Sequence, residues 1–167
     1  MSDISLTERF DAYIKFTNVT GECTDKGHEG WIAVPVLSLN IINKSRNTPQ
    51  AGGWGTAVAQ VGDLYIGLLF DKASLTLTRY LITGTHIAEV DIDVRRQGGK
   101  QVDWYKLVLK DAMITARELT FGCAEFAFNL YITAKTMKES YFPQAFDSGD
   151  QGAEVTYEWD VTTNEIK

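Results

Sequence analysis

Residues 88–95 read AEVDIDVR, and this stretch decides the fold class. Apolar and charged residues alternate strictly along it: the apolar set is Ala88, Val90, Ile92 and Val94, and the charged set is Glu89, Asp91, Asp93 and Arg95. Successive side chains of a strand point to opposite faces, so the pattern predicts a half-buried strand with one charged face. Residues 97–100, QGGK, follow as a predicted hairpin turn, because glycines supply the positive φ values that tight turns require.

Other segments show the same two-residue period or a run of β-forming residues. They are residues 13–19, 31–42, 58–70, 102–115, 126–134 and 155–161. About seven strands at this spacing, joined by turns that contain Gly and Asp, predict an antiparallel β-barrel or sandwich. The chain has 167 residues, the size of one domain. We therefore expect a single domain over 1–167, with long loops at about 43–56 and 140–152.

One segment has the period of a helix instead. Ser74 is a suitable N-cap, Leu77, Leu81 and Ile82 recur at helical spacing, and Gly84 is placed to end the helix. The pattern predicts one short helix over about 75–83. A helix this short is not stable alone, so Leu77, Leu81 and Ile82 are predicted to pack on the barrel.

Composition excludes several classes of protein. The net charge of −6 and the pI near 4.9 disfavour binding to nucleic acid, because an acidic chain is not attracted to phosphates. The longest apolar run, residues 65–70, is too short to cross a bilayer, so we expect no membrane insertion. Residues 1–9, MSDISLTER, lack the apolar segment of a secretory signal peptide. The chain is expected to be made in the cytoplasm, where its two cysteines stay reduced.

The sequence contains no catalytic signature that we recognise, and we expect no enzyme activity and no cofactor. Cys23, His28, His86 and Cys123 are too scattered for a structural zinc site, so no metal is expected. His28 is interpreted as a surface turn residue and Cys123 as a core residue. Asp91 and Asp93 share a strand face as a catalytic pair could, but the pattern favours a solubilising surface.

Four segments resemble the Hcp family, the tube proteins of bacterial type VI secretion systems. Residues 21–34, GECTDKGHEGWIAV, resemble the family's G-E-S-(T/R)-D…H-K-G-(W/E)-I-x-V opening. FDKAS at 70–74, TGTHI at 83–87 and VRRQGGK at 94–100 resemble its V-D-K-A-S, S-G-K-H-I and V-R-K-A-G-G-K blocks. Their order and spacing agree over about residues 12–116. Cys23 replaces the usual Ser, Leu75 stands where the family commonly has Pro, and residues 117–152 match poorly.

The resemblance implies a β-barrel with one helix that assembles as a homohexameric ring. Rings would stack into a tube inside a contractile sheath, and the tube would be expelled with a VgrG-like spike at its tip and effectors in its lumen. The implied partners are therefore other copies of the chain, the sheath, the spike and the effectors. The protein would leave the cell through the type VI apparatus, without a signal peptide.

Two other functions remain as alternatives at this stage. The chain contains 4 Trp, 7 Tyr and 8 Phe, and this high aromatic content would suit a small-ligand-binding β-barrel. The second alternative is an enzyme, in which Asp91 and Asp93 would be the catalytic pair. Oligomeric state separates the first alternative from a tube subunit, since a ligand-binding barrel can be a monomer.

The segment at about 43–56 is predicted to be the contact between stacked rings. It lacks periodicity, contains Pro49 and three glycines, and lies between two well-patterned strands. Trp54 is isolated between Gly53 and Gly55, and Trp is a frequent interface anchor. The predicted ring-stacking residues are Arg46, Asn47, Thr48, Pro49 and Trp54. The alternative is that Trp54 folds back onto its own barrel.

Overall fold

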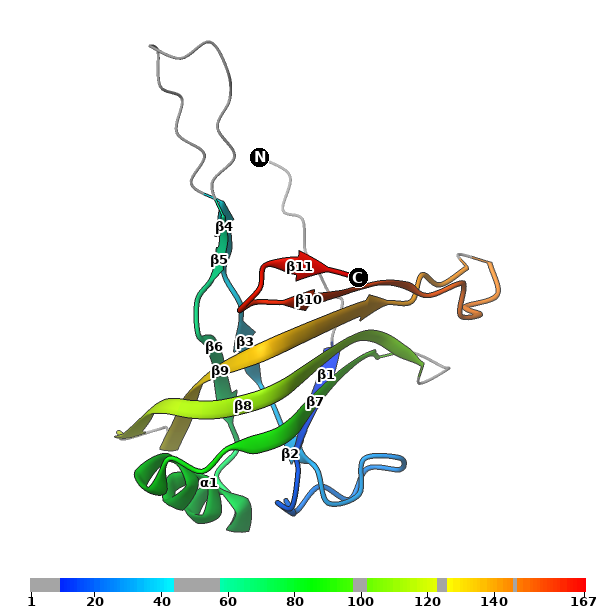
Figure 1. Ribbon diagram of the computed structural model, residues 1–167. Helices are drawn as coiled ribbons and strands as arrows, with labels where there is room; N and C mark the ends of the chain where they lie inside the picture. Colours follow the sequence, from blue (N-terminus) through cyan, green and yellow to red (C-terminus); the bar gives the residue numbers. More distant parts are fainter. Residues whose placement is uncertain (1–9, 44–57, 98–101, 123–125, 146) are drawn as a thin grey trace, which may run out of the picture.

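The computed structural model describes residues 10–43, 58–97, 102–122, 126–145 and 147–167. Figure 1 shows these residues as a strongly curved sheet with one helix, α1, against it. In chain order the elements are β1 (Phe10–Phe16), β2 (Ile32–Ala33), β3 (Val36–Ser38), β4 (Ile41–Asn43), β5 (Ala59–Val61), β6 (Leu64–Leu68), α1 (Lys72–Thr83), β7 (Ile87–Arg96), β8 (Asp103–Phe121), β9 (Phe126–Tyr141), β10 (Val155–Asp160) and β11 (Glu165–Ile166). The prediction of a mainly antiparallel β fold with one short helix is confirmed.

The sheet closes on itself through the segment that carries β2 and β3. The strands follow the order β11-β10-β9-β8-β7-β1-β2, and β6 pairs with both β9 and β3. β2 pairs with β1 while β3 pairs with β6, so one short stretch of chain bridges the two sides. Val34 N–H donates to Ala12 O at 2.9 Å, and Leu69 N–H donates to Ala33 O at 3.3 Å. These bonds complete an antiparallel barrel and remove most free strand edges.

The core is made by the inward-facing residues of the barrel strands. Val90 and Ile92, from the alternating stretch 88–95, are both fully buried. The largest fully buried side chains are Phe16, Phe128, Ile14, Leu64, Ile66, Leu77, Ile87, Ile92, Leu107, Leu130, Ile132 and Met137. Period-two patterning therefore identified the core face of β7 correctly.

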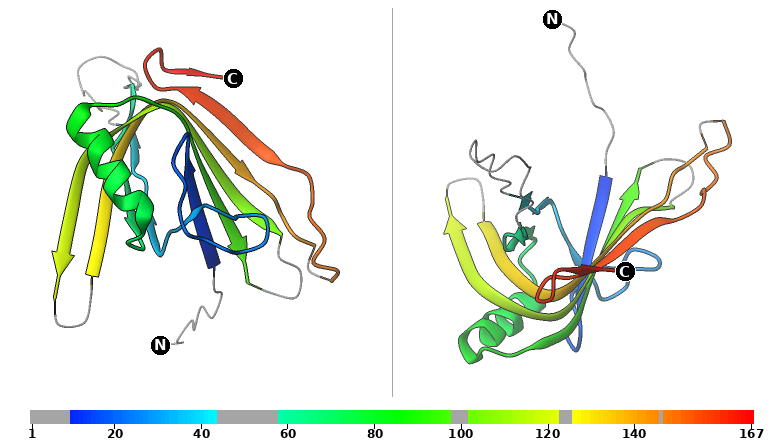
Figure 2. Two further views of the ribbon diagram at one scale, coloured as in Figure 1. Left: turned by 90° about the horizontal axis from the view of Figure 1, so that it is seen from below. Right: turned by 45° about the horizontal axis from the view of Figure 1, so that its top comes forward.

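Several strand boundaries differ from the prediction. The segment 31–42 forms three short strands, because Pro35 has no N–H to donate to a ladder. β8 and β9 are longer than predicted and pair along most of their length. β8 bends in its middle, where Asp111 has a positive φ of 51° and the register shifts between Ile114 and Ala116. Figure 2 shows the result: both ends of the β8–β9 ladder swing toward the same side.

Only the first two residues of the segment 140–152, which was predicted to be a long loop, belong to a strand, but the rest of the segment carries backbone hydrogen bonds of its own. β9 continues to Tyr141, and Gln144 forms an isolated antiparallel bridge with Gln151. Gly152 N–H donates to Pro143 O, and Ala145 N–H donates to Asp150 O. These bonds extend the β9–β10 hairpin beyond the two strands, which the mixed composition of the segment did not reveal.

Helix α1 begins one turn earlier than predicted. Asp71, not Ser74, is the N-cap: its Oδ1 accepts from Ala73 N–H at 2.8 Å, while Ser74 Oγ accepts from Asp71 N–H at 3.0 Å. This reciprocal pair is a capping box, which satisfies two backbone donors that the helix leaves free. Gly84 ends the helix in the left-handed conformation, as predicted, with φ 62°. No helix in the described part of the chain is long and apolar enough to cross a membrane.

The packing face of α1 differs from the prediction at one residue. Leu77 is fully buried and Leu81 is partly buried against the core, but Ile82 is 79% exposed. The prediction that Ile82 packs on the barrel is therefore wrong. At 3.6 residues per turn, Ile82 lies about 140° around the helix from Leu77. Leu81 and Ile82 are neighbours in sequence and cannot both face the same surface.

The N-cap gives a first testable prediction. Asp71 Oδ2 also accepts from Glu22 N–H at 3.1 Å, so this carboxylate joins the start of α1 to a distant segment. We expect Asp71→Ala to lower the free energy of unfolding by about 0.5–2 kcal/mol. Asp71→Asn keeps one oxygen acceptor and should lose less. Urea denaturation of both variants measures this, and equal stability of Asp71→Ala and the wild type would contradict it.

Candidate functional site

The residues predicted to stack rings cannot be placed, but the strands that flank them can. Arg46, Asn47, Thr48, Pro49 and Trp54 lie outside the described residues. β4 and β5 pair with each other, with Asn43 opposite Ala59, and the described strands offer them no other partner. Figure 1 shows this two-stranded stem projecting away from the barrel. The described residues on either side of the segment 44–57 therefore stand away from the barrel.

A groove separates the β4–β5 stem from the C-terminal hairpin β10–β11. Its volume is about 440 Å³, and it is lined by Ile41, Asn43, Ala59, Tyr157, Trp159, Asn164 and Ile166. Trp159 is buried in its wall, and its Nε1–H donates to Asn164 Oδ1 at 3.2 Å. Ile41 and Ile166 are exposed. The groove is open at the surface.

The pocket on the inner side of the barrel is too small for the ligand-binding alternative. A pocket between Leu39, Leu109 and Met137, on the inner side of the barrel, has a volume of only about 20 Å³. Pockets for small organic ligands usually measure about 300–1,000 Å³. The space in this pocket suits about one water molecule.

Residues 17–31, which we call the cover segment, fold over the charged face of β1 and β7. Thr17 N–H and Oγ1–H both donate to Glu89 O, and Glu89 N–H donates back to Thr17 Oγ1. Gly21 N–H donates to Gly30 O at 2.7 Å, which closes the segment into a loop. A Cβ at Gly21 would lie 2.3 Å from Trp31 O, so only glycine fits there. The cover segment thus converts a face that the sequence showed as charged into a partly buried one.

His28 lies at the centre of this cover, which overturns its interpretation as a surface turn residue. Its side chain is 1% exposed. The ring stacks on Tyr13 with centroids 4.4 Å apart and meets Trp31 edge-on at 4.6 Å. Its Nε2 lies 2.8 Å from Asp93 Oδ2, and because a carboxylate can only accept, Nε2 carries the proton. His28 Nδ1 is buried without a hydrogen-bond partner among the described residues.

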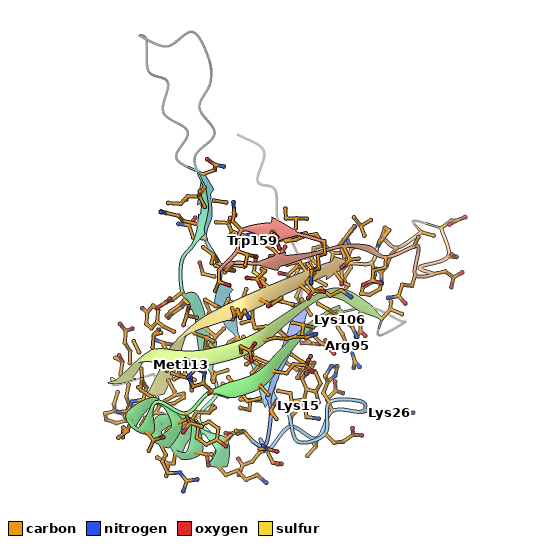
Figure 3. The ribbon with its side chains drawn as sticks, in the orientation of Figure 1. Lys15, Lys26, Arg95, Lys106, Met113 and Trp159 are labelled. Carbon is orange, nitrogen blue, oxygen red and sulfur yellow. The ribbon has the colours of Figure 1, made fainter. Side chains whose placement is uncertain are left out.

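Asp93 belongs to a chain of ion pairs, so it is not a solubilising surface residue as predicted. Lys106 Nζ lies 3.9 Å from Asp93 Oδ1 and 2.9 Å from Asp103 Oδ2. Arg95 joins Asp103, at 3.2 Å, to Asp25 of the cover segment, at 3.3 Å. Figure 3 shows Arg95 and Lys106 side by side at this face. The alternation of charges along β7 therefore supplies partners for the cover segment and β8.

Burial and the neighbouring charges together determine the pKa shifts in this cluster. Partial burial alone would raise the pKa of Asp103, but the hydrogen bonds and charges of Lys106 and Arg95 outweigh it and hold that pKa low. Burial opposes the charge of Lys106, but Asp103 and Asp93 raise its pKa. Burial, followed by the hydrogen bond to Asp25, raises the pKa of Tyr13. Burial and the charges of Glu89 and Asp93 raise the pKa of Asp91.

The cluster also contains three side chains of metal-binding type. Ligand atoms of His28, Asp93 and Asp103 lie within 4.8 Å of one another. Both carboxylates already pair with cationic side chains, Lys106 and Arg95. A divalent cation would have to displace these pairs and would be repelled by the two cations. The donor set is therefore explained as an ion-pair network that attaches the cover segment.

The lowered pKa of Asp103 and the raised pKa of Asp91 predict how the stability of the fold depends on pH. A carboxylate whose folded-state pKa lies below its unfolded value stabilises the fold above about pH 4, and this contribution is lost as the pH falls through the folded-state value. We therefore expect Asp103→Asn to lose less stability than the wild type between pH 5.5 and pH 3. Asp91→Asn is the matched control. In the wild type the raised pKa of Asp91 has the opposite effect on stability as the pH falls. Urea denaturation at the two pH values measures both, and an unchanged pH dependence for Asp103→Asn would contradict the assignment.

Sequence reasoning missed this cluster for an identifiable reason. The charges of Asp93 and Arg95 were visible, but nothing in a two-residue period shows that a segment more than 60 residues away will cover them. The turn-rich composition of residues 21–30 was the only available signal. His86 is exposed just before β7. Cys123 lies outside the described residues, and Cys23 is partly exposed with a free thiol.

Comparison with known proteins identifies relatives of the whole chain. A family model described as "Type VI secretion system effector, Hcp" matches residues 13–141. Protein hcp1 of Pseudomonas aeruginosa is 27% identical over 157 residues, covering 92% of this chain and 96% of the relative.

Solved structures share the fold. One described as a type six secretion system protein has a TM-score of 0.88 at 23% identity and covers 95% of this chain and 100% of its own. Hcp1 from Salmonella typhimurium has a TM-score of 0.77 at 20% identity and covers 95% and 99%. A type VI secretion system effector from Yersinia pestis has a TM-score of 0.72 at 22% identity and covers 90% and 100%. The family model covers most of the barrel, including the cover segment, and the chain therefore belongs to the Hcp family of the type VI secretion system.

Proposed function

We propose that this protein is the structural subunit of the inner tube of a type VI secretion system. Six copies form a ring, rings stack into a tube, and a contractile sheath expels the tube with a spike at its tip and effectors in its lumen. The observation that carries the proposal is the family match over residues 13–141. Hcp proteins are structural and secreted, not enzymes.

The described surface is compatible with a subunit that must contact copies of itself. A closed ring needs two unlike surfaces on each subunit. The described residues include several exposed apolar side chains, among them Val58, Leu69 and Phe121. Where exposed apolar side chains lie together, they mark interaction sites in soluble proteins. The packed barrel gives these surfaces a rigid support.

The proposed tube has three kinds of partner. The sheath, the VgrG-like spike and the effectors are its partners, and the protein is made in the cytoplasm and leaves through the type VI apparatus. The segment 43–56, held by the β4–β5 stem, forms the contact between stacked rings. Leu77 and Leu81 anchor α1 to the barrel and so maintain the outer shape of the subunit.

Size-exclusion chromatography with light scattering tests the proposed function. We expect a mass about six times the chain's 18.6 kDa, independent of dilution over the range where the ring is stable. A monomer at high protein concentration would overturn the tube assignment. That result would favour a barrel that acts alone.

A further inference from the structure

The apolar face of the β8–β9 hairpin continues past the end of the barrel. Leu119 pairs with Phe128, and Phe121 pairs with Phe126. Directly paired residues share a face of the sheet, so these side chains extend the row that lines the core. Phe128 is fully buried, but Phe126 is 47% exposed and Phe121 is 81% exposed. Side chains of core type are therefore left uncovered at this end.

A residue from outside the hairpin joins this row. The ring of Phe70, just before α1, lies 4.9 Å from Phe126 and 5.7 Å from Phe128. The rings of Phe121 and Phe126 are 6.1 Å apart. We call Phe70, Leu119, Phe121 and Phe126 the tip cluster. All four are exposed large apolar residues that lie together, which is the usual mark of an interaction surface.

A second exposed aromatic cluster lies at the opposite end of β8. Trp104 contacts Phe10 at 4.9 Å and Tyr141 at 5.4 Å between ring centroids. Phe10 and Tyr141 are 41% and 40% exposed, and Val155, paired with Tyr141, is 64% exposed. We call Phe10, Trp104, Tyr141 and Val155 the base cluster. Trp104 and Phe121 stand 17 positions apart on β8, at most about 56 Å along a strand.

We propose that the tip cluster of one subunit packs against the base cluster of a second copy of this chain within the ring. This inference rests on the proposed function and names the residues that close the ring. Self-association is a property of the family, which makes a second copy the expected occupant. The two clusters are unlike and lie at different ends of one chain, as a head-to-tail contact requires. Aromatic rings also pair favourably beyond the area they bury.

The bend in β8 determines what such a contact builds. Both ends of the β8–β9 ladder swing toward the same side, as Figure 2 shows. Successive copies joined end to end through a bent body are rotated relative to one another. A head-to-tail series closes into a ring when the rotation between successive copies matches, and it forms an open filament when it does not.

Charged substitutions in the two clusters test this contact. Phe121→Asp places a charge in the tip cluster, and Tyr141→Asp places a charge in the base cluster. Ile82→Asp is a control on an exposed residue of α1 outside both clusters. Circular dichroism first establishes that each variant is folded. Sedimentation at a concentration where the wild type is assembled should then give monomers for both cluster variants and the wild-type mass for Ile82→Asp. An equimolar mixture of the two cluster variants should form a dimer, because each retains one intact surface.

The outcomes distinguish this inference from the proposed function. If the wild type assembles and folded Phe121→Asp or Tyr141→Asp keeps the wild-type mass, the tip–base contact is wrong while the tube assignment stands. A dimer formed by Tyr141→Asp alone would show tip-to-tip pairing and would also overturn the head-to-tail contact, as would a mixture that remains monomeric. A monomeric wild type would overturn both.

Discussion

Excising residues 46–53 and replacing Trp54 by Ala should abolish the stacking of rings while leaving each ring intact. β4 and β5 pair through Ile41–Val61 and Asn43–Ala59, so the stem can be closed by a shorter connection. The excised residues lie outside the described residues, and the barrel core is built from described residues. The expected result is complete loss of tubes and of secretion, with an unchanged melting temperature. Electron microscopy and a secretion assay measure the two losses.

A length-matched control separates the effect of the side chains in this segment from the effect of its length. Replacing residues 46–53 by an eight-residue Gly/Ser linker, with Trp54 retained, keeps the length but removes the other predicted contact residues. If the rings of this control still stack in part, Trp54 accounts for the remaining affinity between rings. If the excised variant still formed tubes and supported secretion, the segment would have no role in stacking and the assignment should be dropped.

Leu77→Ala should cost about 2–5 kcal/mol in the free energy of unfolding. Leu77 is fully buried in the interface between α1 and the barrel, so truncation leaves a cavity in the core. For a chain of this length the loss corresponds to a fall in melting temperature of roughly 4–20 °C. Leu81→Ala should cost less, because Leu81 is only partly buried. Thermal and urea denaturation at one fixed protein concentration measure both.

Ile82→Ala is the matched control for the helix. The same type of change at a side chain that is 79% exposed should alter stability by no more than about 0.5 kcal/mol. A large loss in Ile82→Ala together with a small one in Leu77→Ala would mean that the helix packs through its other face.

The fold could be predicted because its signals are local. Alternation along residues 88–95 identified the buried face of β7, and Gly84 marked the end of α1. The errors in the helix arose where two nearby residues fitted the same role equally well. Asp71 and Ser74 are both good caps, and only the observed hydrogen bonds show which begins the helix. Leu81 and Ile82 are equally apolar, and the phase of the helix decides between them.

The surfaces could not be predicted because they depend on distant parts of the chain. Burial of Asp93 requires His28, 65 positions away, and the exposure of Phe121 depends on where the barrel ends. A two-residue period continues unchanged from Phe128 to Phe126, although one is buried and the other exposed. Patterning shows which face of a strand is apolar, but it does not show which element covers that face.

Rotational symmetry of the assembled particle tests the central claim most directly. Class averages of the purified wild-type protein in electron micrographs should show closed rings with sixfold symmetry. Rings of a different symmetry, or particles no larger than a single chain, would contradict the account of this protein as a hexameric tube subunit.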